Sequence, residues 1–139
     1  MIGYPGISGM PARTRLAQLI AHNEGYGLPR EIPTVRKNPG DLKHSPHSSH
    51  EGIGPDDIGI IDTIDHGWDD LERQLAIYAS EHLNLLEMVN TYLGFAKDAK
   101  LDESIVDGNN RVPYLRSICS GLNMGPGALV SEALKIPAV

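Results

Sequence analysis

Residues 15–27 read RLAQLIAHNEGYG, and the rest of the chain is best interpreted outward from this stretch. The apolar side chains within 16–20 fall at positions i, i+3 and i+4, which is the spacing of one apolar helix face. Pro11 suits a first helical position, and Gly25 suits the residue that follows a helix end. The sequence therefore predicts a helix over about 11–24.

An irregular segment follows this helix over residues 25–57 and has little hydrophobic periodicity. An irregular stretch of this length inside a compact domain is usually functional or disordered, and its scattered apolar residues favour an ordered lobe. The next residues, IGIIDTI over 58–64, are rich in β-branched side chains. We expect them to pair with a short strand near Asp41–Lys43 in a minor β-hairpin.

Helical signals return after the irregular lobe. Asp65 is a candidate N-cap for a helix whose apolar residues recur over 68–78. The pair Asn84 and Glu87 has the spacing of a capping box at the start of another helix. A third helix is predicted from about Pro113 to an end near Gly121–Gly125, and Pro126 is a candidate first residue of a last one.

Length and composition place the chain among ordinary globular proteins. The 139 residues fit one domain, which we assign to 1–139 with an N-terminal arm over 1–10. The predicted class is mainly α, as a helical bundle with a small irregular lobe. Cys119 is the only cysteine and lies in an apolar helical pattern, so we expect a structural thiol and no intrachain disulfide.

Charge is distributed unevenly between the two parts of the sequence. Residues 1–50 carry six Lys/Arg against three acids (+3), and the remainder carries six against fifteen (−9), for a net charge of −6. This charge difference suggests that an anionic or neutral polar ligand meets the N-terminal part, although by itself it favours a solvated surface without a ligand. The overall sign argues against nucleic acid. We see no signal peptide and no apolar stretch long enough for membrane insertion.

Glu24 is the candidate catalytic residue that the first helix suggests. It lies where that helix ends, where partial burial and the negative end of the helix dipole both raise a carboxyl pKa. A carboxylic acid that stays protonated near neutral pH can act as a general acid. An ordinary exposed glutamate is the alternative interpretation.

Four blocks of the sequence, in order, carry a family resemblance. They are LIAHNEGYG at 19–27, RKNPGDLK at 36–43, IIDTIDHGWDDLERQLAIY at 60–78 and DGNNRVPYLRSICSGLNM at 107–124. The first resembles the active-site helix of the lysozyme-like superfamily, and the set resembles phage-associated lysozyme-like muramidases over roughly residues 15–135. Asp41 stands where asparagine is commoner in that group.

The resemblance implies a lysozyme-like α+β fold and a role for Glu24 as general acid in cleaving the β-1,4 bond between N-acetylmuramic acid and N-acetylglucosamine. Asp41 and Asp62 are candidates for a second catalytic carboxylate. If neither lies opposite Glu24, a lytic transglycosylase reaction, in which one glutamate serves as acid and then base, is preferable.

Candidate substrate-binding residues are His22, Asn38, His44 and Tyr114. Asn38 begins an Asn-Pro-Gly sequence, which is also a good turn, so a purely structural role competes with glycan binding. For Tyr114, core packing is likewise the alternative to a role in substrate binding.

The expected partner is therefore the glycan strand of peptidoglycan, bound by a monomer without a cofactor or metal. Such a protein would be made in the cytoplasm and act at the cell wall after release, virion delivery or dedicated secretion. Two rival interpretations remain open. One is a non-catalytic glycan-binding or virion structural module on the same fold. The other is a zinc-dependent amidase or peptidase whose ligands would be His44, His47, His50 and Glu51.

Overall fold

A computed structural model of the chain describes residues 12–50, 56–101 and 111–139. In chain order its elements are α1 (Arg15–Asn23), α2 (Ile32–Val35), β1 (Ser48–Ser49), β2 (Ile60–Ile61), α3 (Ile64–Ser80), α4 (Leu85–Tyr92), α5 (Arg111–Leu122) and α6 (Val130–Ala133). The prediction of a mainly helical chain with a minor antiparallel hairpin is thus confirmed. The predicted arm over 1–10 and Pro11 lie outside the described residues.

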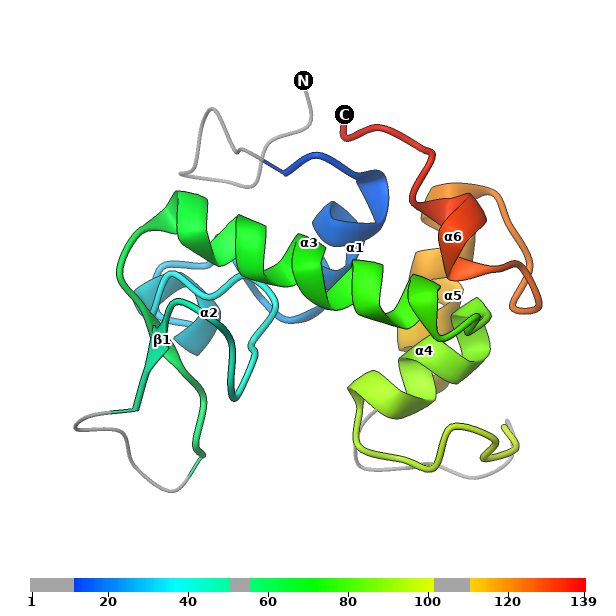
Figure 1. The fold of residues 1–139 in the computed structure, drawn as a ribbon, viewed down its shortest axis with the longest axis horizontal. Coiled ribbons are helices and arrows are strands. Elements are labelled where there is room, and N and C mark those ends of the chain that lie inside the picture. The colour runs from blue at the N-terminus through cyan, green and yellow to red at the C-terminus, as the bar shows by residue number, and fades with distance from the viewer. Residues whose placement is uncertain (1–11, 51–55, 102–110) are drawn as a thin grey trace.

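The long helix α3 organises the molecule. It crosses the middle, with α2 and the hairpin at one end and α4, α5 and α6 at the other (Figure 1). Helix α5 packs against both α1 and α4, while α3 contacts α1 and α6. One hydrophobic core joins these helices, and its fully buried members include Leu16, Trp68 and Ile118. Burial of this apolar surface is the main stabilising contribution to the helical part of the fold.

Side-chain caps determine the first residues of α1 and α3. Helix α1 begins at Arg15, because the Thr14 side chain accepts a hydrogen bond from the backbone N–H of Ala17. Helix α3 begins at Ile64, because Thr63 caps it through the N–H of His66. The predicted cap at Asp65 is wrong by two residues, and Asp65 instead supplies the acidic first turn that the helix dipole favours.

The C-terminal helices follow the predicted signals more closely. The capping box between Asn84 and Glu87 is present in both directions, at 2.8 and 2.9 Å, and confirms the start of α4. Helix α5 ends at Leu122, as predicted. The last helix is shorter than expected and begins at Val130, because Pro126 lies in a preceding turn. Within the described residues, no helix combines the length and apolar character needed to cross a membrane.

The hairpin pairs different residues from those predicted. Strand β2 pairs with β1, with Ser48 opposite Ile61 and Ser49 opposite Ile60. The predicted partner segment near Asp41–Lys43 contributes one hydrogen bond, from the N–H of Gly59 to the carbonyl oxygen of Leu42 at 2.9 Å. That segment does not become a strand, because the turn at Asn38 holds its backbone in place through side-chain hydrogen bonds.

Candidate functional site

Glu24 is the C-cap of α1, and its half-buried carboxyl is held by a residue from the far end of the sequence. The hydroxyl of Tyr114, on α5, donates a hydrogen bond of 2.7 Å to Oε2 of Glu24. Burial raises the pKa of Glu24 to about 7, the Tyr114 hydrogen bond lowers it, and the charge of Asp41 raises it. The expectation of a raised pKa at this position is confirmed, and its main cause is burial.

Asp41 is the acidic neighbour of Glu24. It lies in the turn that follows Asn38, with a positive φ of 53°. The pKa of Asp41 is raised to about 6, mainly by burial; the charge of Asp56 adds to the rise, and Arg36 opposes it. Among the described residues, Oδ1 of Asp41 is buried and has no hydrogen-bond partner. A buried carboxylate oxygen of this kind is costly unless a further group satisfies it.

Tyr92, on α4, also contacts the turn that carries Asp41, and no sequence signal pointed to it. Its hydroxyl donates a hydrogen bond to the carbonyl oxygen of Gly40. Burial raises its pKa well above the ordinary value, and the charges of Glu24 and Asp41 add to that rise. These couplings place Glu24, Asp41, Tyr92 and Tyr114 in one electrostatic cluster. In the sequence Tyr92 was simply one of the residues on the α4 helix face, with no signal that its hydroxyl would reach a turn 52 residues away.

Asn38 has a structural role, so its prediction as a direct glycan contact requires correction. The residue is 0% exposed. Its amide nitrogen donates to the carbonyl oxygens of Leu42 and Gly59 at 2.8 and 2.9 Å, and its amide oxygen accepts from the N–H of Leu42 at 2.9 Å. Both amide hydrogens and one oxygen lone pair are therefore committed to the backbone that carries Asp41.

Asp62 lies elsewhere, as the partner of His66. Its Oδ1 is 2.7 Å from Nδ1 of His66, and the hydrogen bond from that imidazole lowers the pKa of Asp62. The Asp62 side chain is 62% exposed. Of the two carboxylates predicted as partners of Glu24, Asp41 is the one whose charge acts on it. This removes Asp62 from the candidate catalytic set.

Three further residues singled out in the sequence, His22, Tyr114 and Cys119, differ in exposure. His22 is exposed in the last turn of α1, two residues before Glu24. Tyr114 is 7% exposed, and its ring packs in the core, as the core-packing interpretation predicted. Its hydroxyl also donates a hydrogen bond to Glu24, so the residue belongs to the site as well. Cys119 is half-buried against the same core, in keeping with a structural thiol.

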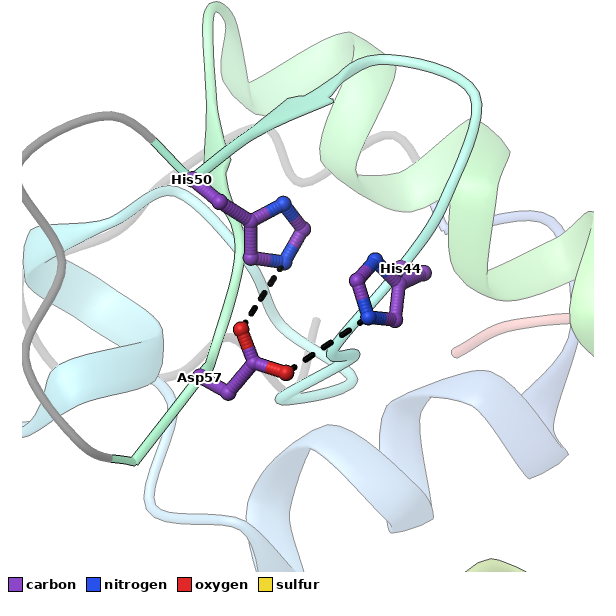
Figure 2. Close-up of side chains that lie close together, drawn as sticks. All are labelled: His44, His50 and Asp57. Atoms are coloured by element: carbon purple, nitrogen blue, oxygen red, sulfur yellow. Dashed lines mark ion pairs between the residues drawn. The ribbon is translucent and has the colours of Figure 1, made fainter.

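Of the three described members of the zinc set considered for an amidase, His47 lies apart from His44 and His50. Nδ1 of His47 lies 2.6 Å from Oδ1 of Asp70, a carboxylate that is buried on α3 and also accepts from the Ser45 hydroxyl. His47 stacks on His66 at a centroid distance of 3.9 Å. Glu51 lies outside the described residues. His44 and His50 instead converge on a residue that the prediction did not include, Asp57 (Figure 2).

Comparison of the chain with protein families, with curated proteins and with solved structures finds no match. Its function therefore has to be inferred from the geometry of the Glu24 cluster.

Proposed function

We propose that this chain is a peptidoglycan-cleaving glycosidase with a lysozyme-like fold, and that Glu24 is the general acid that protonates the leaving glycosidic oxygen. The observation that supports this most directly is the carboxyl of Glu24, with a pKa of about 7 and a single orienting hydrogen bond from Tyr114. A general acid works best when its pKa lies near the operating pH and its position is fixed.

The two carboxyls of the cluster differ in pKa in the sense that this chemistry requires. Between about pH 6 and pH 7, Asp41 is mainly ionised while Glu24 is mainly protonated. An ionised carboxylate beside a protonated one can stabilise an oxocarbenium-like transition state or orient a water molecule. Oδ1 of Asp41 is buried and has no hydrogen-bond partner among the described residues, so no other contact in that part of the chain already occupies it.

The lysozyme-like assignment draws on the order of elements as well as on the resembling sequence blocks. The acid ends the first helix, the irregular lobe with its hairpin follows, and the remaining helices pack behind. The substrate under this proposal is the glycan strand of peptidoglycan, which the chain would meet at the cell wall. The proposal assigns no catalytic role to a zinc ion or to the histidines of residues 44–50.

The test is mass spectrometry of the muropeptides that wild-type protein and Glu24→Gln release from purified peptidoglycan. Reducing N-acetylmuramic acid ends that disappear in the variant would establish a hydrolase, and 1,6-anhydro ends lost in the same way would establish a transglycosylase. Glu81→Gln is a matched control, because Glu81 is an exposed acid at the C-terminal end of another helix, α3.

Two outcomes would contradict the proposal in different ways. If neither protein releases glycan products, the enzymatic claim is wrong and a non-catalytic glycan-binding or virion structural module replaces it. If products persist in Glu24→Gln at the level of Glu81→Gln, the chain cleaves glycan but Glu24 is not its acid.

A further inference from the structure

Three side chains converge beside the hairpin, outside the Glu24 cluster. His44 precedes β1, His50 follows β1 directly, and Asp57 lies three residues before β2. Nε2 of His44 is 3.5 Å from Oδ2 of Asp57, and Nε2 of His50 is 3.8 Å from Oδ1 of the same carboxylate. Figure 2 shows both imidazoles directed at opposite oxygens of Asp57.

The candidate ligand atoms lie close enough together to approach the spacing of a zinc site. Ligand atoms about 2.0–2.2 Å from a tetrahedral zinc ion lie roughly 3.3–3.6 Å from one another. The candidate ligand atoms of His44, His50 and Asp57, one from each residue, all lie within 4.8 Å of one another, so a small closure of these side chains would complete the set. The two imidazole rings are tilted by 34°, with centroids 4.3 Å apart.

We propose that His44, His50 and Asp57 bind one divalent ion of the zinc type, which braces the hairpin. Two neutral imidazoles and a carboxylate are ligands that zinc prefers, whereas calcium and magnesium favour all-oxygen sets. Exposed fractions of 75%, 28% and 55% leave the three side chains open to an ion from solvent. The proposal does not depend on the proposed glycosidase activity.

The local fold explains what the ion would contribute. Strands β1 and β2 have two residues each, and so short a hairpin gains little stability from its own hydrogen bonds. The ion would join the chain on both sides of β1 to the segment that leads into β2. Nε2 of His50 also contacts the carbonyl oxygen of Lys43, so ion binding exchanges this hydrogen bond for a metal bond and moves the ring proton to Nδ1.

His47 distinguishes this site from the zinc set considered in the sequence. It occupies the same short segment as His44 and His50, but its Nδ1 is engaged by the buried Asp70 on α3. Among the described residues, the carboxylate that joins His44 and His50 is Asp57, which lies seven residues after His50.

The experiment is a calorimetric titration of the full chain with Zn²⁺, made on wild type and on His44→Ala, His50→Ala and Asp57→Asn. Asp57 has a φ of +58°, which asparagine tolerates, and far-UV circular dichroism checks that each variant is folded. His82→Asn is the matched control: His82 is also exposed with a positive φ, of +61°, and lies after α3.

We expect one ion per chain in wild type and His82→Asn, and an affinity lowered by at least about tenfold in each of the three ligand variants. Zinc should also raise the Tm of wild type and His82→Asn but not of the ligand variants. The proposal is overturned if wild type binds no stoichiometric zinc, or if the folded ligand variants bind it as tightly as His82→Asn.

Discussion

The hydroxyl of Tyr114 donates a hydrogen bond of 2.7 Å to Glu24, a residue 90 positions earlier in the chain. The bond connects the C-terminal end of α1 to the first turns of α5, two helices that pack directly against each other. Its effect on the carboxyl opposes that of Asp41, because a hydrogen bond favours the ionised form of Glu24 while a nearby negative charge disfavours it.

Tyr114→Phe should therefore raise the pKa of Glu24 above about 7. Carbon-detected NMR titration of the Glu24 carboxyl measures this directly and needs no substrate. Loss of the orienting contact should also lower stability by about 1 kcal/mol and, if the chain cleaves glycan as proposed, kcat by about tenfold. An unchanged Glu24 titration would show that the hydrogen bond does not act on the carboxyl.

Asp41→Asn should move the same titration in the opposite direction. Removing the Asp41 charge takes away one of the causes that raise the pKa of Glu24, so the carboxyl should titrate at lower pH. If the chain cleaves glycan as proposed, wild-type activity should be greatest between about pH 6 and pH 7, falling on the acid side as Asp41 is protonated and on the alkaline side as Glu24 ionises. Opposite shifts in Asp41→Asn and Tyr114→Phe would separate electrostatic coupling from nonspecific disturbance of the site.

The stability of the wild type should fall as the pH rises from about 4.5 to about 7. Over this window the folded chain keeps a proton on Glu24 that the unfolded chain has already lost, so raising the pH favours unfolding. Glu24→Gln should remove this part of the pH dependence and stabilise the protein at pH 8 by about 2 kcal/mol, because one pKa unit corresponds to about 1.4 kcal/mol. Urea unfolding at pH 5 and pH 8 compares the two proteins. If the stability of Glu24→Gln fell with pH as steeply as that of wild type over this window, the raised pKa assigned to Glu24 would be wrong.

Asn38→Ala should destabilise the chain by about 3 kcal/mol, because it leaves the buried carbonyl oxygen of Gly59 and the N–H of Leu42 without their partner and removes one of the two hydrogen bonds to the carbonyl oxygen of Leu42. Asn23 is the matched control. Its amide nitrogen also makes two hydrogen bonds, to the carbonyl oxygen of Leu19 and the hydroxyl of Ser117, but at a half-buried position, so Asn23→Ala should cost about 1 kcal/mol. Chemical denaturation measures both. Equal costs would contradict the structural role given to Asn38.

Gly67→Ala should be among the most destabilising small substitutions in the chain. A Cβ on Gly67 would lie 2.2 Å from the carbonyl oxygen of Lys37 and 2.9 Å from Cδ of Pro39, so α3 could not pack against the turn that carries Asp41. We expect a loss of about 3 kcal/mol. Gly125→Ala meets nothing within 4 Å and should change stability by less than about 0.5 kcal/mol. A thermal melt of each variant tests the contrast.

Local signals predicted the helices α1, α3, α4 and α5, but not the short helix α2, the first residues of α1, α3 and α6, or the strand pairing. The capping box at Asn84 and the apolar spacing over 68–78 depend on interactions between residues three or four apart. A local sequence pattern is therefore enough to predict them. The partner of β2 depends on which segment the turn at Asn38 leaves free to pair. That turn is held by contacts across as many as 21 residues, which no local pattern records.

The sequence by itself determined the mainly helical class, the C-terminal boundaries of α1 and α5, and the position of Glu24 where a helix ends. Only the tertiary structure decided which groups meet that carboxyl. Tyr114 donates a hydrogen bond to it, and the charge of Asp41 raises its pKa. Asp62 pairs with His66 instead, and His47 pairs with Asp70. The physical reason is that helix spacing and capping arise within a few residues. A shifted pKa, by contrast, arises from burial and from charges that the fold brings together from distant parts of the chain.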